Sequence, residues 1–384
     1  MLNDKPLKGV VVLDLTRVLA GPYCTMLLSD LGAKVIKVER PEVGDDSRHF
    51  GPFVNGKSAY FCSLNRGKKS IVLNLKDKDD LTILKEIVKK VDVLAENFRP
   101  GTMEKLGLSY EELKKINPRL IYAATSGYGH TGPRAKKAAY DMIVQALGGI
   151  MSITGQPDGP PVRVGASIGD IIAGLFTAIG INAALYHREQ TGKGEKIDIA
   201  MLDSQVAILE NAITRYMVTG TPPGPLGSRH PSITPFEAFK TSDEWIVLAV
   251  GNDSLWAKFC KAVNRDDLIN HPSFATNLLR TENHSRLKPI MDEILEQRTA
   301  QEWIEYLDQK EIPVGPINTV DKLLTDPQVM ARNMLVQVDD PIIGKMTIAG
   351  NPIKMSSMDD ESFRRPAPDL GEHTQEVIRE FLDE

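Results

Sequence analysis

Short apolar runs alternate with amphipathic segments through the first third of the chain. Runs rich in Val, Ile and Leu predict β-strands, and apolar residues that recur every three or four positions predict helices. The expected strands are Val10–Leu15, Val35–Val38, Ser70–Leu75, Val93–Glu96 and Leu120–Ser126; the expected helices are Tyr23–Leu31, Asp79–Val91 and one after the capping box Ser109–Glu112. Such alternation is typical of a parallel sheet covered by helices on both faces, so we predict an α/β fold.

Polar residues follow several of these strands at the carboxyl end, where open parallel sheets bind their ligands. They are Thr16 and Arg17, Glu39 and Arg40, Asn97 to Arg99, and Ser126 to Gly129. Three of them are arginines, which suits an anionic ligand. For any single arginine, ordinary surface charge is the simpler interpretation.

The segment Val162–Ala184 places one carboxylate, Asp170, at the start of an apolar helix that we expect over Asp170–Glu189. Small residues precede it, and bulky apolar residues surround the helical wheel after it, which predicts burial on nearly all sides. Asp170 has two interpretations: a helix N-cap, or a nucleophile kept ionised by the helix N-terminus in a pocket poor in water. This segment alone favours the cap.

The chain is long enough for two domains. After an expected strand Lys196–Met201 and helix Leu202–Val218, the Pro- and Gly-rich segment Thr219–Pro235 marks a boundary. We predict a large Rossmann-like domain of residues 1–224 and 328–384, with a last strand at Met346–Ala349 and a last helix after Gly371. Residues 225–327 form a smaller α/β domain, with a strand at Trp245–Val250 and helices at Ser254–Val263, Ser285–Glu296 and Ala300–Gln309.

Composition narrows the class of protein. An apolar content of 42% and a charged content of 25% are typical of globular proteins, and the net charge of −5 does not favour nucleic-acid binding. The cysteines Cys24, Cys62 and Cys260 fit neither a disulfide framework nor a zinc site. The first residues do not resemble a signal peptide, and we expect no window to approach the roughly 20 apolar residues of a membrane span. We therefore expect a cytoplasmic protein.

Common cofactor and hydrolase motifs are missing from the sequence. The first strand-to-helix turn, DLTRVLAGPY, has one glycine and is no dinucleotide cradle, and no P-loop, HExxH or GxSxG motif occurs. Seven segments in order instead resemble the family III CoA-transferases, a group that includes formyl-CoA:oxalate and carnitine CoA-transferases; the acetyl-CoA:oxalate CoA-transferases are the most similar branch. The segments are Leu19–Pro41, Ser63–Lys76, Glu96–Leu108, Pro118–Pro133, Asp170 through TGKGEKIDIAM, Leu226–Phe239 and Pro366–Ile378.

The resemblance implies an activity. Asp170 would attack an acyl-CoA thioester and pass through an aspartyl anhydride and an aspartyl-CoA thioester, in ping-pong order, before CoA reaches a small carboxylate such as oxalate. Acetyl-, formyl- or succinyl-CoA would be the donor, with no tightly bound cofactor and no metal. The resemblance also implies a homodimer of two ring-like, interlocked chains. With it included, the nucleophile is the favoured interpretation of Asp170.

The family pattern assigns further residues at matching positions. Those that would bind CoA are Val18, Arg40, Leu73, Lys76, Asn97, Phe98, Arg99, Lys105 and Tyr140. Arg17 and Tyr60 would lie near the acyl group or acceptor, and Asp141 beside Tyr140 on the site's floor. For Lys76 and Lys105, solvated surface charge is almost equally favoured, and Tyr60 could instead be a packing aromatic. Arg17, Arg48, Arg229 and His230 are candidate cations for an oxalate site, with no placement implied.

The sequence differs from the family pattern at several positions, and other functions stay open. Leu19 and Ala138 stand where some oxalate-using relatives have glutamine and lysine, and the loop Ala249–Trp256 has one glycine where those relatives have several. Asn252 could simply cap the next helix. An α-methylacyl-CoA racemase would pair Asp170 with a histidine, but Tyr140 occupies that position; His130 is the remaining candidate. Two more functions stay open: a CoA-binding scaffold without turnover, and CoA transfer to another dicarboxylate or to a hydroxy acid.

Overall fold

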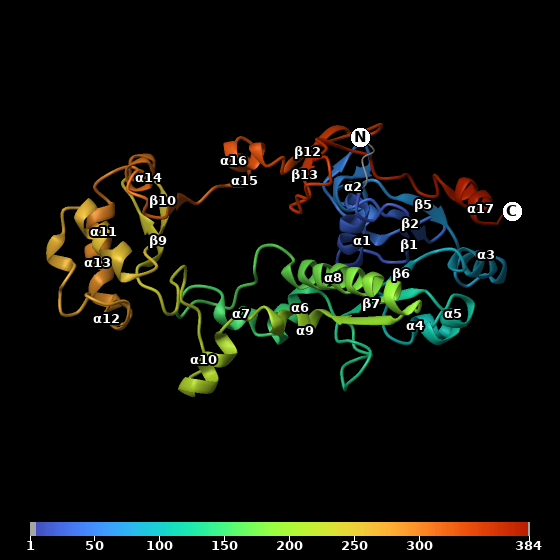
Figure 1. Cartoon of the computed structure of the whole chain (residues 1–384), viewed down its shortest axis with the longest axis horizontal. Helices are drawn as coiled ribbons and strands as arrows, with labels where there is room; N and C mark the ends of the chain where they lie inside the picture. The colour runs from blue at the N-terminus through green and yellow to red at the C-terminus, as the bar shows by residue number, and fades with distance from the viewer. Residues whose placement is uncertain (1–4, 383–384) are drawn as a thin grey trace. The chain divides into compact units, whose positions relative to one another are not determined.

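The computed structural model describes residues 5–382, which form two compact units (Figure 1). The first unit takes in the chain up to Met151, Arg163–Thr221, and the chain from Pro327 onward; the second consists of Ser152–Val162 and Pro222–Asp326. The expected division at 224/225 and 327/328 therefore differs mainly at residues 152–162, which group with the second unit. A short stretch of this kind carries no compositional sign of the unit it joins.

A six-stranded parallel sheet forms the centre of the first unit, in the order β5-β2-β1-β6-β7-β8. Its strands are β1 (Val11–Asp14), β2 (Lys34–Glu39), β5 (Lys69–Val72), β6 (Val93–Glu96), β7 (Ile121–Ser126) and β8 (Lys196–Ala200). The predicted α/β class is confirmed. Because β1 pairs with both β2 and β6, the chain order reverses between β1 and β6, which is where such sheets bind ligands.

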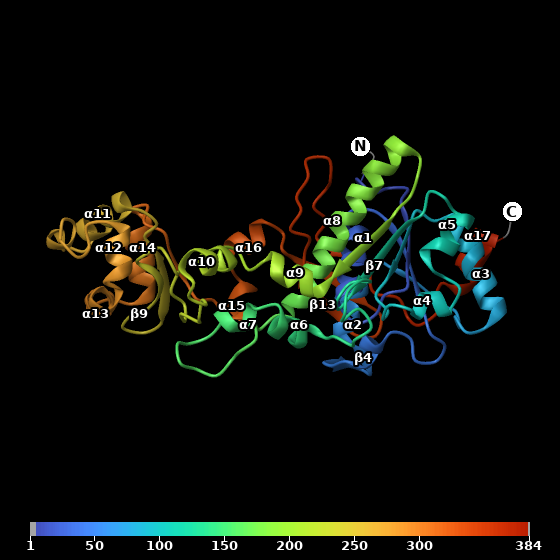
Figure 2. The same cartoon turned by 90° about the horizontal axis from the view of Figure 1, so that it is seen from below.

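Helices cover both faces of this sheet (Figure 2). On one face lie α1 (Ala20–Asp30) and α8 (Ile168–Thr191), and on the other lie α3 (Lys78–Val88), α4 (Thr102–Lys105), α5 (Tyr110–Ile116) and α17 (Thr374–Leu382). Strand residues alternate between the two: Val12 packs with α1 and α8, whereas Leu13 packs with α3 and α17. Every side chain of the sheet can therefore be assigned to one face.

Helix α8 is longer than the expected Asp170–Glu189. It also bears on the expectation that no segment is apolar enough to span a membrane. Among the described residues it is the one helix long and apolar enough to cross a membrane by length and composition, with a mean hydropathy of 1.7. The expectation that no segment would reach this threshold is thus wrong. Ala178, Ile181 and Ala184 pack into the core with α1 and the sheet, and a core helix passes the same test.

Helices α1 and α8 approach each other unusually closely. A Cβ atom built on Gly174 would lie 2.6 Å from the backbone oxygen of Ala20, a distance that side chains do not tolerate. Glycine at 174 therefore lets the first turn of α1 touch α8 one helical turn after Asp170.

The first unit has further elements outside this layered core. They are η1 (Asp46–His49), β3 (Phe53–Val54), β4 (Lys57–Ser58), α2 (Ala59–Asn65), α6 (Asp141–Leu147), α9 (Met201–Ala207), α10 (Ala212–Thr219), α16 (Pro327–Ala331), β12 (Leu335–Asp340), β13 (Gly344–Ala349) and β14 (Phe363–Arg364); α7 (Ile150–Ile153) spans the boundary between the two units. The helix expected over Leu202–Val218 is two helices, because the chain breaks between α9 and α10, where Glu210 has a φ of +55°.

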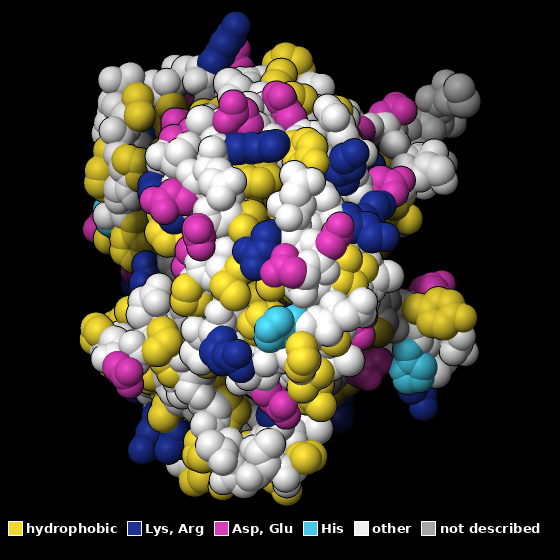
Figure 3. Space-filling view, turned by 90° about the vertical axis from the view of Figure 1, so that its left-hand side faces the viewer, with side chains coloured by type: hydrophobic (Ala, Val, Ile, Leu, Met, Phe, Trp, Pro, Cys, Tyr) yellow, Lys and Arg dark blue, Asp and Glu magenta, His cyan; other side chains and the backbone are white. Residues whose placement is uncertain are grey.

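The second unit packs helices against a small antiparallel sheet ordered β11-β10-β9. Its elements are β9 (Phe236–Lys240), β10 (Trp245–Ala249), α11 (Asp253–Ala262), η2 (Asp266–Leu268), α12 (Asn277–Glu282), α13 (His284–Leu295), α14 (Ala300–Asp308), β11 (Val314–Pro316) and α15 (Val320–Leu323). Asn252 caps α11, as considered from the sequence, by accepting a hydrogen bond from the Leu255 N–H. Basic and acidic side chains are intermixed on the face shown in Figure 3.

The close approach at Gly174 is testable. Gly174→Ala should lower the free energy of unfolding by about 1–3 kcal/mol, because the new methyl group meets backbone and forces α1 and α8 apart. Urea unfolding measures the change. Gly180→Ala in the same helix is the matched control: its Cβ would lie 3.1 Å from a movable Ile197 methyl group, and alanine's helix propensity, worth about 1 kcal/mol, offsets that contact. Equal effects of the two substitutions would contradict the assignment.

Candidate active site

Asp170 lies in the first turn of α8 and is not its N-cap. Ser167 occupies the cap position, and Asp170 is the third helical residue, half-buried. Burial raises the pKa of Asp170 to about 7, and the nearby charge of Asp141 adds to this shift, whereas the backbone N–H of Ala20 donates to the carboxylate and favours its ionised form. The capping interpretation is therefore wrong, and a carboxylate remains for chemistry.

Asp141 fixes the turn that carries Asp170. Asp141 begins α6; its Oδ1 accepts from the Gly169 N–H at 2.8 Å, and its Oδ2 accepts from Gln145 Nε2 at 2.8 Å. The other end of the Gln145 amide accepts from the Val164 N–H at 2.9 Å. Two side chains of α6 therefore hold both ends of the segment 164–169 that leads into α8. Sequence analysis placed Asp141 on the floor of the site but did not foresee this contact.

Tyr60, near the start of α2, is near enough to Asp170 to feel its charge. Burial raises the pKa of Tyr60 to about 12, and the charge of Asp170 contributes to the shift. The Tyr60 ring packs edge-on against Phe50 with centroids 5.8 Å apart. The phenol therefore stays protonated at neutral pH and keeps its O–H donor.

The turn Thr16–Val18 after β1 joins the predicted residues of neighbouring strands. The Asn97 side chain accepts from the Arg17 N–H at 2.9 Å and donates to the Arg17 carbonyl at 2.8 Å. Arg17 and Arg40 both contact Asp46, at 3.0 and 2.6 Å, and the Arg17 guanidinium lies 5.6 Å from the centre of the Phe98 ring. Five of the predicted residues (Arg17, Val18, Arg40, Asn97 and Phe98) thus gather where the strand order reverses.

Other predicted residues lie outside this cluster. Leu73 is buried in the core beneath β5, so its side chain packs and faces no ligand. Lys76, Arg99 and Lys105 are exposed in segments that follow β5 and β6. Within residues 5–382, the ion pairs of Asp46 do not include these three. Tyr140, at the N-cap of α6, is 75% exposed next to Asp141.

His130 lies on the opposite face of the sheet from α8. Its Nδ1 is 3.0 Å from Lys196 Nζ, and its Nε2 is 3.8 Å from Glu96 Oε1. Glu96 shares its face with Leu94 and receives a hydrogen bond from Tyr122, and both Leu94 and Tyr122 belong to the core under α3 to α5. His130 is therefore not paired with Asp170, and the two-base arrangement of a racemase is not formed.

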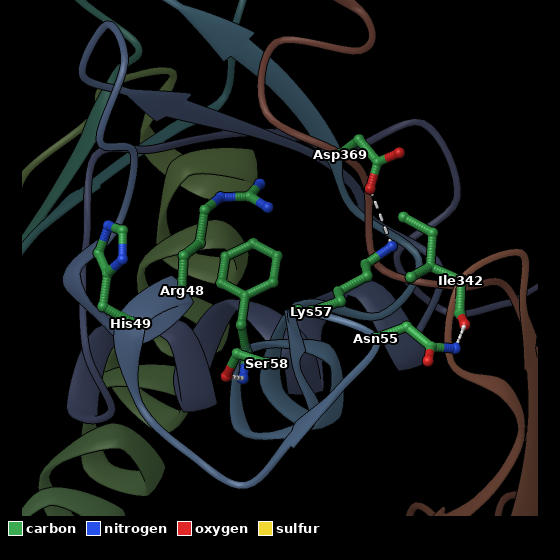
Figure 4. Close-up of a pocket in the computed structure, with 9 residues that line it drawn as sticks. Arg48, His49, Asn55, Lys57, Ser58, Ile342 and Asp369 are labelled. Atoms are coloured by element: carbon green, nitrogen blue, oxygen red, sulfur yellow. Dashed lines mark hydrogen bonds and ion pairs between the residues drawn. The ribbon is translucent and has the colours of Figure 1, made fainter.

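A cavity of about 380 Å³ lies beside η1 and the β3–β4 hairpin (Figure 4). Its cations are already neutralised. Arg48 binds both carboxylate oxygens of Glu39 at 2.8 and 2.7 Å, and Lys57 pairs with Asp340 and Asp369 at 2.8 and 2.9 Å. Arg229 and His230 belong to the second unit, where Arg229 donates to the Thr281 carbonyl and His230 stacks on Phe236. None of these contacts favours an oxalate site at Arg48.

Three groups of the site, Lys37, Asp45 and the Ala20 N–H, are not among the residues predicted from the sequence. Lys37 carried a signal, because a lysine inside the apolar run Val35–Val38 must be buried with a partner. Asp45 and the Ala20 N–H carried none, since a loop aspartate and a backbone group reveal their partners only in three dimensions.

Comparison with known proteins shows the family of this chain. A family model described as CoA-transferase family III matches residues 7–374. An acetyl-CoA:oxalate CoA-transferase of Acetobacter aceti is 47% identical over 98% of this chain and 96% of its own length. A succinyl-CoA:glutarate CoA-transferase of Homo sapiens is 42% identical over 100% of this chain and 87% of its own.

A solved structure shares the fold. The crystal structure of a CAIB/BAIF family protein from Brucella suis has a TM-score of 0.86 and 39% identity, and covers 98% of this chain and 100% of that one. The family match, the relatives and the shared fold lead to one conclusion: the chain belongs to CoA-transferase family III and is an enzyme that acts on CoA thioesters.

Proposed function

We propose that this enzyme moves CoA from an acyl-CoA donor to a small carboxylate by covalent chemistry at Asp170. One observation carries the proposal: a carboxylate with a pKa raised to about 7 sits in the first turn of a helix, where the Ala20 N–H favours its ionised form and its charge is near enough to raise the pKa of Tyr60. A raised pKa makes the ionised carboxylate a better nucleophile, and the donors can stabilise the oxyanion of each addition step.

The proposed steps balance without acid or base catalysis. An Asp170 oxygen attacks the thioester carbonyl, the C–S bond breaks, and CoA leaves as a thiolate from an aspartyl–acyl anhydride. The thiolate attacks the aspartyl carbonyl and releases the donor carboxylate, which leaves aspartyl-CoA. The acceptor carboxylate then displaces the thiolate to form a second anhydride, and the thiolate takes the acceptor's acyl group and frees Asp170. Each step exchanges one anion for another, so positioning provides most of the catalysis.

We propose oxalate as the acceptor and acetyl-, formyl- or succinyl-CoA as the donor. The name of the Acetobacter aceti relative supports oxalate, whereas that of the human relative points to a longer dicarboxylate, glutarate. Tyr60 and Arg17 are the proposed acceptor contacts. Because Asp46 already pairs with Arg17, the positive charge left for a doubly charged acceptor is smaller than the sequence implies.

We assign CoA to the carboxyl ends of β1, β2, β5 and β6. Val18 and Leu73 would contribute backbone contacts, since the Leu73 side chain is buried. Arg40, Lys76, Arg99 and Lys105 are the cations for its phosphates, and Asn97, Phe98 and Tyr140 would line the groove. All four cations are exposed, which suits a ligand that brings several negative charges.

We also propose that the enzyme is an interlocked homodimer. Large apolar side chains are exposed on α6, α8 and α10 of the first unit, where a partner could cover them. They are Met142, Ile143, Leu147, Ile179, Tyr186, Ile213, Tyr216, Met217 and Val218.

A cytoplasmic location stays a proposal. Cys24, Cys62 and Cys260 are buried free thiols, and unpaired thiols of this kind are typical of reducing compartments.

Turnover tests the nucleophile. Wild-type enzyme with acetyl-CoA and a panel of carboxylates should form new CoA esters, detected by mass spectrometry, and kcat/KM should rise with pH to a plateau above about 7 as Asp170 ionises. Asp170→Asn should lose activity by at least about 1000-fold, since the amide cannot form the anhydride. Asp203→Asn is the matched control, because Asp203 is the third residue of α9 and exposed. An active Asp170→Asn variant would refute the mechanism.

The raised pKa of Asp170 also predicts a pH-dependent stability. Between about pH 4 and 7 the folded protein holds a proton at Asp170 that the unfolded chain has released, so wild type loses stability as pH rises through this window. Asp170→Asn lacks this loss. Its stability relative to wild type, from urea unfolding, should therefore increase from pH 4 to pH 8, by at most about 4 kcal/mol. A difference that does not change with pH would contradict the assignment.

Oligomeric state is measurable by light scattering. At micromolar concentration the enzyme should have twice the 42.4 kDa mass of one chain. The double variant Met217→Glu/Val218→Glu, which places charge on the most exposed apolar side chains of α10, should shift the protein toward monomer. Thr82→Glu on the exposed side of α3 should leave the mass unchanged. A wild-type monomer would overturn the proposed dimer.

A further inference from the structure

Side chains from four separate segments bind the backbone of the turn Thr16–Val18. The Thr16 N–H donates to Asp14 Oδ1 at 2.9 Å, and the Thr16 carbonyl accepts from Lys37 Nζ at 2.7 Å. Asn97 binds both backbone groups of Arg17, and the Val18 N–H donates to Asp45 Oδ1 at 3.0 Å. Five consecutive polar groups of this backbone are therefore held by side chains, where a surface turn would use water.

The turn holds Val18 in a strained conformation. Its φ of +69° lies in the left-handed region, which a β-branched residue seldom adopts. Such a conformation persists only where the surroundings impose it, and it is found most often at functional sites. The side chains that bind the turn are those surroundings.

Lys37 and Asp45 are the most costly of these side chains to bury. Their charged groups lie 2.8 Å apart, and both side chains are almost completely buried. Burial by itself would raise the pKa of Asp45, but the Lys37 ammonium and the Ser47 and Val18 N–H donors hold it below its ordinary value. Because a buried ion pair contributes little net stability compared with apolar residues of similar size, a gain in stability does not explain this pair.

The turn leads directly to the group that touches Asp170. Two residues after Val18, Ala20 begins α1 and touches α8: its carbonyl oxygen would lie 2.6 Å from a Cβ on Gly174, one helical turn after Asp170, and its N–H favours the ionised Asp170 carboxylate. Thr16 also supports the first turn of α1 from below, because a Cβ on Gly21 would lie 2.3 Å from the Thr16 Cβ. A displacement of the turn would therefore move the Ala20 N–H away from the carboxylate.

We propose that Lys37 and Asp45 are positioning residues for Asp170. The pair binds Thr16 and Val18, holds the turn in its strained form, and so aims the Ala20 N–H at the carboxylate without touching substrate. This inference rests on the proposed function of Asp170. It adds to that site one residue of β2, Lys37, and one residue of the loop between β2 and η1, Asp45.

The test compares two variants with a matched control. Asp45→Asn removes the charge, and Lys37→Met/Asp45→Asn removes both charges and leaves no unpaired buried ion. Asp30→Asn breaks another buried pair, with Arg66 at 2.7 Å, at the far end of α1. Circular dichroism and thermal unfolding establish that each variant is folded before kinetics are measured.

Both pair variants should lower kcat on the order of 10- to 100-fold and leave the KM for acyl-CoA within about threefold. The pH midpoint of kcat/KM should move upward, because the ionised carboxylate loses a donor. Asp30→Asn should lower the melting temperature and leave the pH midpoint in place. Asp141 and Tyr60 also interact electrostatically with Asp170. Every variant therefore keeps both residues, so that a change in the pH midpoint is not caused by their loss.

Three results would overturn the inference. One is a folded double variant with wild-type kcat and pH midpoint; another is an Asp30→Asn variant with the same change in midpoint. The third is failure of both pair variants to fold, which would assign the pair to the fold alone. A wild type without turnover, or an active Asp170→Asn variant, would instead refute the proposed function, so the two failures are distinguishable.

Discussion

The hydrogen bond from the Ala20 N–H to the Asp170 carboxylate is the interaction on which the rest of the site depends. It requires the first turns of α1 and α8 to touch, and glycine at 174 makes this approach sterically allowed. It also sets the chemistry, because the donor favours the ionised carboxylate while burial and Asp141 oppose ionisation. The site thus holds a carboxylate that is near its titration point and has a donor aimed at it.

Polar residues that support this arrangement share one face of the sheet. Asp14 and Lys37 lie at alternate strand positions beneath α1, on the same side as Val12 and Val35, whereas Leu13, Ile36 and Leu94 serve the opposite core. Near the carboxyl ends of β1 and β2, the face of the sheet under α1 therefore contains buried charged side chains, whereas the opposite face is apolar. Glu96 and His130 form a separate polar group on the opposite face, which keeps His130 away from Asp170.

The elements that hold Asp170 are separate from the side chains proposed to contact the acceptor, so one scaffold could serve several acceptors. In the proposed mechanism attack, leaving and return all occur at Asp170, whose position depends on α6, α8 and the β1 turn, none of which needs to recognise the acceptor. Discrimination between acceptors such as oxalate and glutarate would then lie with side chains around Tyr60 and Arg17. Changes there need not disturb the turn that holds Ala20.

Local sequence determined much of the secondary structure and singled out Asp170 as a candidate. The apolar run Val93–Glu96 is the observed β6, the Ser109 cap begins α5, and Asp170 stood out because one charge precedes a long apolar helix. Tertiary structure alone decided that Asp170 is not a cap, that Asn97 binds the Arg17 backbone, and that Lys37 and Asp45 meet. Periodicity and capping arise from neighbours within a few residues, which the sequence displays. Arg17 and Asn97 lie 80 positions apart and meet only through the strand order, and Lys37 and Asp45 meet only because the loop after β2 folds back; no local pattern encodes either contact.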